Sequence, residues 1–359
     1  MPGWLARRGA DPYAHLVRVG VLTGGGDCPG LNAVIRAIVR QGERIHGDEI
    51  IGFLDAWDGV RARKTMPLTV ETMRGTLPKG GTVLGTKRGS PFDTESGVEE
   101  VAGTIADLGL DAIIVIGGNG SLTVAHALHE QHGMPIIGVP KTIDNDIVGT
   151  DVTFGFHTAV QIATDAIDRL HTTAESHDRV MVVEVMGRHS GWIATYAGIA
   201  GGATMVLIPE IPFDIEEVCR RLSRRHERNR FASIVVVAEG AEPVPGSLDM
   251  HDRTYDRFGH VLLGGISDVI AREIAARTGF ETRVVMLGHV QRGGTPTAYD
   301  RVLCTRFGVA AINLVHEHGW GQMVVARGGE IVPAPLSLAV GRSKPVDPAL
   351  YDVAQVFFA

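Results

Sequence analysis

Short, continuously apolar segments recur along the chain, and most are bounded by glycine, proline or polar residues. Their lack of polar alternation indicates parallel strands that are covered on both faces. The predicted strands are Val17–Leu22, Ile50–Leu54, Ala112–Ile116, Pro135–Val139, Val180–Met186, Thr204–Ile208, Ser233–Ala238 and Val284–Leu287.

Segments with apolar residues at helical spacing lie between these strands, and examples are Leu31–Gln41, Val98–Leu108, Thr158–Thr172 and Ile215–Arg224. Alternation of strand and helix predicts a doubly wound α/β fold. In such sheets ligands bind beyond the carboxyl ends of the strands. The polar stretch Ala241–Leu263 is predicted to be an insertion or a long loop, and the proline-rich tail after about Gly328 shows little periodicity.

Composition narrows the class of protein. Glycine accounts for 46 of the 359 residues, a share of about 13% against the usual share of about 7%. The glycines occur in pairs and triplets without the three-residue period of collagen. The net charge of −7 argues against a nucleic-acid-binding protein. Three isolated cysteines favour a reducing cytoplasm, and no apolar run reaches the ~18 residues of a membrane span. Residues 1–17 lack the apolar core of a secretion signal and are interpreted as an extension.

Glycine-rich turns follow several predicted strands. Thr23–Gly30 leads into a predicted helix, where backbone N–H groups and the helix dipole favour an anion. Pro29 and Leu31 exclude a dinucleotide fingerprint and a Walker loop, respectively. Gly117–Ser121 repeats the strand–glycine–helix pattern, and Gly80–Arg88 adds a glycine loop with two cations. Each turn alone could be a packing or solvated turn, but together they predict a polyphosphate site.

Two carboxylates, Asp144 and Asp146, follow the strand Pro135–Val139, with Lys141 and Thr142 beside them. Phosphoryl transfer needs a group that orients the attacking oxygen and cations that neutralise the phosphate charge. An Asx-turn that caps a neighbouring element is the alternative interpretation.

Basic residues cluster near other predicted strand ends, and arginine suits bidentate phosphate binding. Together with a glutamate they predict a site for a phosphorylated sugar. The residues are Arg179, Arg188, Glu239, Arg283, His289 and Arg292.

These motifs resemble the phosphofructokinase family in order and spacing over about residues 18–315. The matching segments are Thr23–Asn32, Thr142–Asp146, Met186–His189 and Gly288–Gly294. The resemblance implies phosphoryl transfer to the 1-hydroxyl of fructose 6-phosphate in glycolysis, with Mg²⁺. A lipid or NAD kinase relative shares only the turn Gly117–Gly120.

The resemblance also implies a role for each matching residue. Asp144 would be the general base, Asp146 and Asn119 would lie at the magnesium ion, and Thr142 and Arg188 would contact the transferred group. The residues that would bind the phosphoryl donor are Gly25, Arg88, Gly118, Asn119, Gly120 and Ser121. Substrate binding falls to Thr142, Asp144, Met186, Gly187, Arg188, Glu239, His289 and Arg292, with Arg179 and Arg283 supplied by a neighbouring subunit of a homodimer or homotetramer.

The fold implied is two similar Rossmann-like doubly wound domains with mainly parallel sheets. A nucleotide-binding domain would comprise residues 18–155 and 291–335, and a fructose 6-phosphate domain residues 156–290. Residues 336–359 would form a C-terminal tail.

Three departures from the family pattern affect function. Asn119 replaces an acidic magnesium ligand, which raises the alternative of a weakly active regulatory paralogue. Gly120 favours ATP, whereas Lys141 is more frequent in pyrophosphate users; the combination resembles a mixed group that mostly uses ATP, so ATP is expected and pyrophosphate is the alternative. Arg36, Arg40, Arg228 and Arg230 fit the family's effector pocket or a solvated surface, but His171 and Thr204 replace an arginine and a glutamate used there.

Overall fold

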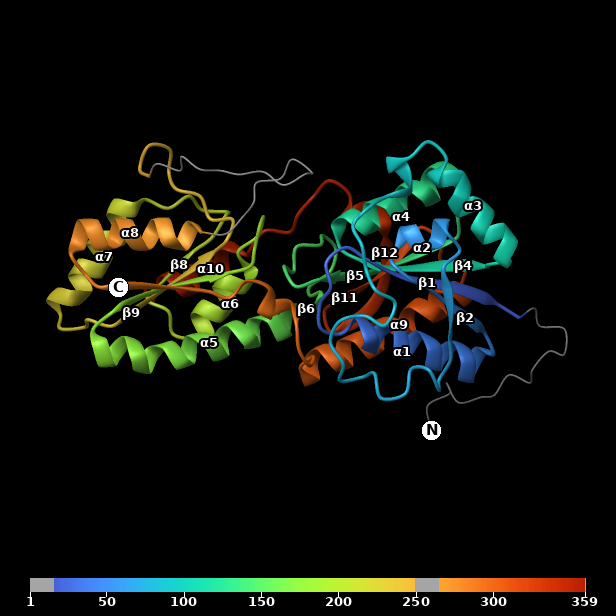
Figure 1. Cartoon of the computed structure of the whole chain (residues 1–359), viewed down its shortest axis with the longest axis horizontal. Helices are drawn as coiled ribbons and strands as arrows, with labels where there is room; N and C mark the ends of the chain where they lie inside the picture. Colours follow the sequence, from blue (N-terminus) through green and yellow to red (C-terminus); the bar gives the residue numbers. More distant parts are fainter. Residues whose placement is uncertain (1–15, 249–264, 359) are drawn as a thin grey trace.

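The computed structural model describes residues 16–248 and 265–358. Most of the predicted extension 1–17 and the part of the predicted insertion from residue 249 onward lie outside the described residues. Two sheets, each covered by helices, lie side by side along the long axis of the molecule (Figure 1).

In the described part of the chain, eight strands form the larger sheet, in the order β12-β11-β5-β4-β1-β2-β3 with β6 beside β5. Most pairs are parallel, and the antiparallel pairs β2–β3 and β11–β12 lie at its two edges. The strands are β1 (Arg18–Gly24), β2 (Glu49–Phe53), β3 (Thr65–Leu68), β4 (Ala112–Gly117), β5 (Ile136–Thr142), β6 (Phe154–Gly155), β11 (Gln322–Arg327) and β12 (Glu330–Pro335).

Both faces of this sheet are apolar, as the unbroken apolar strands predicted. In β4, Ile114 and Ile116 pack on one face, and Ile113 and Val115 pack on the other. One face is covered by α1 (Leu31–Gln41) and α9 (Ala298–His316), and the opposite face by α2 (Trp57–Arg61), α3 (Gly97–Leu108) and α4 (Asn119–His132) (Figure 1).

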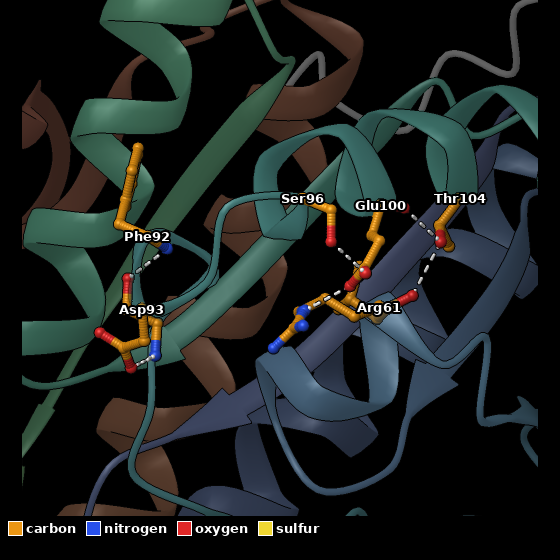
Figure 2. A network of polar contacts seen from close by, with 8 residues as sticks. Arg61, Phe92, Asp93, Ser96, Glu100 and Thr104 are labelled. Carbon is orange, nitrogen blue, oxygen red and sulfur yellow. Dashed lines mark hydrogen bonds and ion pairs between the residues drawn. The ribbon is translucent and has the colours of Figure 1, made fainter.

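Helices α2 and α3 are joined by polar contacts (Figure 2). Arg61 of α2 donates to the Glu100 carboxylate of α3 at 2.6 Å, and Ser96 donates to the same carboxylate at 2.8 Å. Thr104 donates to the Val60 carbonyl at 2.8 Å. These bonds fix the outer helices that support β1 and β4.

The smaller sheet has the order β10-β7-β9-β8, with every pair parallel within the described residues. Helices α5 and α6 pack on one face, and α7 and α8 pack on the other. The elements are α5 (Phe156–His177), β7 (Val180–Val185), α6 (Trp192–Ala200), β8 (Met205–Leu207), α7 (Ile215–Glu227), β9 (Ser233–Ala238), α8 (Ile266–Thr278) and β10 (Thr282–Met286).

The chain passes between the two sheets three times. It enters the smaller unit at α5 and returns to the larger one at α9. After β12 it crosses again, and α10 (Pro348–Gln355) packs against α6 and β8 (Figure 1). The tail that showed little periodicity therefore contains a strand and a helix.

The α/β class with mainly parallel sheets is confirmed. All predicted strands are present; β9 and α1 have the predicted bounds, and the other strands have shifted ends. The two units differ in strand number, with eight strands against four in the described residues, and β3, β6, β11 and β12 of the larger sheet were not predicted. None of the helices in the described ranges is both long and apolar enough to cross a membrane.

Candidate active site

The first two glycine turns meet at a switch point of the larger sheet. From β1 the chain continues to β2 on one side, whereas β4 and β5 lie on the other side. The loops after β1 and β4 therefore border one crevice beyond the strand ends, which is where doubly wound sheets bind ligands.

These turns are packed against each other. A carbon added at Gly24 would lie 2.5 Å from Ser121 Oγ, so a side chain at Gly24 would collide with the second turn. Gly25 has a φ of +79°, which favours glycine. Helix α4 begins at Asn119 with no side-chain cap, so its first N–H groups remain available to an anion.

The third glycine loop lies against the first. Thr86 Oγ1 donates to the Gly25 carbonyl at 2.6 Å, and Thr23 Oγ1 donates to the Gly85 carbonyl at 2.8 Å. Gly80 contacts the backbone of Gly294 so closely that no side chain fits there. Arg88 follows as an exposed side chain. Three loops predicted separately thus form one surface.

Lys141 is buried beneath this surface, and its Nζ donates to the Gly26 carbonyl. Burial lowers the pKa of its ammonium group. Gly120, by contrast, faces open space, because a carbon added there would meet no atom within 4 Å. A buried lysine therefore lies under the crevice, and the outer side of the crevice at Gly120 is open.

The two aspartates lie just beyond β5. Thr142 Oγ1 accepts from the Asp144 backbone N–H at 3.0 Å, and Asn119 Nδ2 donates to Asp146 Oδ2 at 2.9 Å. Burial, aided by the nearby Asp146 charge, raises the pKa of Asp144 to about 7. Burial also raises the pKa of Asp146.

Two oxygens of this group lack a partner. Asp144 Oδ1 and Asn119 Oδ1 are buried, and neither makes a hydrogen bond within the described chain. Such atoms are costly unless a ligand satisfies them. The Asn119 amide oxygen, beside the Asp146 carboxylate, fits Mg²⁺, which usually keeps several waters and takes few protein ligands. No group of three His, Cys, Asp or Glu side chains that could hold a metal ion occurs in residues 16–248 and 265–358.

The sugar-phosphate candidates follow the smaller sheet. Met186, Gly187 and Arg188 come after β7, and Gly288–Arg292 comes after β10. The switch point of that sheet lies between these two strands, because β9 and β8 are on the other side of β7. Glu239 ends the neighbouring β9, and burial raises its pKa.

One arginine connects the two halves of the site. Arg292 Nη1 donates to the Asp27 carbonyl at 3.4 Å, and its guanidinium fills the space where Gly26 would carry a side chain. The predicted phosphate loop and the predicted sugar-phosphate residue Arg292 are therefore in contact. His289 is exposed on the same segment.

Arg179 and Arg283 lie away from this contact. They lie at the opposite, amino-terminal ends of β7 and β10, and both pair with Glu281, at 2.7 and 2.5 Å. Their predicted role in a neighbouring subunit's site stays a prediction.

The predicted effector residues are only partly gathered. Of these, His171, Thr204 and Arg230 line a hollow of about 280 Å³, to which Arg225, a residue not predicted, also contributes. Arg228 does not line it, and Arg36 and Arg40 lie on α1 of the other unit.

Several residues near the aspartates were not predicted. Asn145 is buried between them, and its Oδ1 accepts from the Thr153 N–H at 3.0 Å and from Lys344 Nζ at 3.2 Å. Ser343 Oγ lies 3.5 Å from Asp146 Oδ2. The position of Asn145 inside the matched motif was an available signal, but nothing local marks Ser343 or Lys344.

A family model described as phosphofructokinase matches residues 18–315. The chain is 55% identical over 342 residues to a pyrophosphate–fructose 6-phosphate 1-phosphotransferase of Streptomyces coelicolor, covering 95% of this chain and all of the relative. It is 53% identical over 343 residues to an ATP-dependent 6-phosphofructokinase of Mycobacterium leprae, with the same coverage. The Pichia pastoris phosphofructokinase structure superimposes with a TM-score of 0.79 at 30% identity, over 97% of this chain but only 37% of that longer one.

Proposed function

The chain belongs to the phosphofructokinase family, and from that premise we propose that it transfers the γ-phosphoryl group of ATP to the 1-hydroxyl of fructose 6-phosphate. The products are fructose 1,6-bisphosphate and ADP. The observation that carries this proposal is the buried, unpartnered Asp144 Oδ1 beside a crevice bordered by glycine turns and an uncapped helix.

Asp144 acts as the base. Its carboxylate accepts the proton of the 1-hydroxyl as that oxygen bonds to phosphorus, and the bond from phosphorus to the bridging oxygen of the donor breaks. A base whose pKa is close to the working pH is effective in proton transfer, and the pKa of about 7 meets this condition.

Asp146 and Asn119 are the side chains that would hold Mg²⁺, which supplies positive charge to the donor phosphates. Arg188, which follows β7, and Thr142 would contact the transferred group. The first N–H groups of α4, together with Gly25 and Arg88, bind the remaining donor phosphates.

The sugar phosphate occupies the other half of the cleft. Arg292 and His289 provide positive charge for its 6-phosphate, and Glu239 accepts from sugar hydroxyls. Met186 and Gly187 border the sugar, where the φ of +141° at Gly187 favours glycine.

The donor is the finer point. Open space at Gly120 favours ATP, whose nucleoside must extend beyond the phosphates. Pyrophosphate is the second candidate, favoured by the buried Lys141 ammonium at the first turn. Relatives of similar identity are named for each donor.

Formation of fructose 1,6-bisphosphate should be measured with fructose 6-phosphate, Mg²⁺ and either ATP or pyrophosphate. We expect turnover with both substrates present and a higher kcat/KM for ATP. A higher kcat/KM for pyrophosphate would show that pyrophosphate is the donor, and the proposed transfer to fructose 6-phosphate would still stand. No turnover with either donor would overturn the proposed function and favour a ligand-binding paralogue.

A further inference from the structure

A segment of the C-terminal tail lies against the two aspartates. After 3₁₀ helix η5 (Leu336–Ala339) the chain crosses from the larger unit to the smaller one, and Ser343–Val346 pass beside the loop that follows β5. This segment lies outside residues 18–315, which the family model matches.

Lys344 uses all its hydrogen-bonding groups there. Its Nζ donates to Asn145 Oδ1 at 3.2 Å and to the carbonyls of Thr150 and Asp151, each at 2.9 Å. An ammonium group has three donors, so all three are satisfied. Its backbone N–H donates to the Asp146 carbonyl at 2.7 Å, and its carbonyl accepts from Trp192 Nε1 at 3.0 Å.

The turn that these bonds hold is an unusual one. Asn145 has a φ of +52°, a left-handed conformation that costs free energy for residues other than glycine, although asparagine tolerates it better than most. Residues in such conformations persist where the surrounding structure over-determines them. The Thr153 N–H and Lys344 Nζ provide that restraint through the Asn145 side chain.

The smaller unit anchors the other side of the tail. Lys344 Nζ lies 5.1 Å from the centre of the Trp192 ring, and the Val346 N–H donates to Glu210 Oε1 at 2.9 Å. Glu210 also accepts from the Gly191 N–H at 3.0 Å. One residue therefore connects the aspartate turn of the larger unit to the start of α6 in the smaller one.

We propose that Lys344 is a positioning residue that holds the turn Asp144-Asn145-Asp146 in its working geometry. It touches neither substrate nor donor and acts through Asn145 and the backbone of Asp146. The role rests on the proposed function, since it assigns a purpose to the geometry of these two aspartates.

The test compares Lys344→Met with Lys344→Arg and with Arg342→Met. Methionine keeps nearly the length of the side chain and removes the ammonium. Arginine keeps the charge, but its planar guanidinium cannot donate from one nitrogen to three acceptors. Arg342 is the matched control, an exposed cation two residues away whose side chain makes no hydrogen bond or ion pair within the described residues.

Lys344→Met and Lys344→Arg are expected to lower kcat about tenfold or more, because a misplaced reacting group is costly. The KM for fructose 6-phosphate should change less than about threefold, and Arg342→Met should match the wild type. A Lys344→Met kcat equal to that of the wild type overturns the proposal, as does a loss that appears equally in KM. An inactive wild type would instead refute the proposed function.

A second variant covers the case in which Lys344→Met does not fold. Lys344→Cys treated with 2-bromoethylamine regains an ammonium at nearly the original length, while the native cysteines Cys28, Cys219 and Cys304 are buried. Recovery of kcat in the treated variant, with treated wild type unchanged, supports positioning by the ammonium. Folded, treated protein that stays as slow as untreated protein contradicts it.

Discussion

At the scale of single residues, the candidate site is a small group of polar atoms in which charge and burial oppose each other. A buried oxygen of Asp144 lies near Asp146, and the Asn119 amide of the second turn donates to the Asp146 carboxylate. The sequence identified these residues as candidates. It could not predict their pKa values, because burial is a property of the assembled fold.

The raised pKa of Asp144 predicts a pH-dependent gain in stability for Asp144→Asn. The pKa is about 7 in the folded protein, against 3.8 for an aspartate in its ordinary environment. Between these values the carboxyl is ionised only in the unfolded state, so wild-type stability falls as the pH rises from about 4 to about 7 and the loss is complete above that. The variant should therefore gain on the order of 3 kcal/mol over the wild type at pH 8 relative to pH 4.

Urea unfolding of metal-free protein at both pH values measures this gain. Asp352→Asn, at an exposed position on α10, is the control. An equal difference between Asp144→Asn and wild type at pH 4 and pH 8 would contradict the burial of a charged carboxylate.

Asn119→Asp is predicted to strengthen magnesium binding. The change replaces the 2.9 Å bond to Asp146 with a second carboxylate, so the metal-free protein should lose stability through repulsion. Added Mg²⁺ should then raise the Tm more than it does in the wild type, and activity should saturate at lower Mg²⁺. Thermal unfolding across a MgCl₂ titration, with KCl at equal ionic strength as the control, measures this; an unchanged Mg²⁺-dependent shift would contradict it.

At the scale of elements, a strand was predicted from the sequence where its own residues form a clear apolar pattern. Strands buried on both faces, such as β4 and β9, are unbroken apolar runs and were predicted. Strand β6 has two residues, and β3 and β12 are antiparallel edges that include proline. Their pairing depends on a neighbouring strand far along the chain, so their local sequence carries little signal.

The start of α5 depends on a residue of another helix. Asp300 of α9 is fully buried, and its carboxylate accepts from the Gly155 N–H at 3.1 Å, the Thr158 N–H at 2.8 Å and Thr158 Oγ1 at 2.6 Å. These bonds join the start of α5, where the chain leaves the larger unit, to α9, where the chain returns to it.

Asp300→Asn is therefore predicted to destabilise the protein by about 2–3 kcal/mol, because an NH₂ donor replaces one carboxylate oxygen and leaves a buried N–H group without an acceptor. Asp214→Asn is the matched control: Asp214 caps α7 by accepting from the Glu216 N–H at 2.9 Å, but it is exposed. Its cost should stay below about 1 kcal/mol, since asparagine is a good N-cap. Equal losses for the two variants in urea unfolding would be the contrary result.

At the scale of the whole molecule, the cleft needs both sheets, while Arg179 and Arg283 lie at the far ends of their strands. The predicted contribution of these arginines to a neighbour's site gives a subunit-mixing test. Arg283→Ala and Asp144→Asn should each be nearly inactive. Co-assembled, they should recover roughly a quarter of wild-type activity, because random pairing in a two-fold dimer forms some intact sites.

The control mixes Arg188→Ala with Asp144→Asn, two changes in the part of the site that one chain provides, and no recovery is expected. Failure of the Arg283→Ala mixture to recover activity would show that each chain's site works without its neighbour.

By itself the sequence determined the α/β class, the main strands, the glycine turns and the two aspartates, because each depends on a short period or motif within a few residues. Only the tertiary structure decided that Arg292 meets Asp27, 265 residues away, and that Lys344 holds Asn145, 199 residues away. Such contacts follow from the path of the chain between the sheets, and no local pattern encodes that path. The raised pKa of Asp144 has the same origin, since the surroundings that bury its carboxyl come from distant segments.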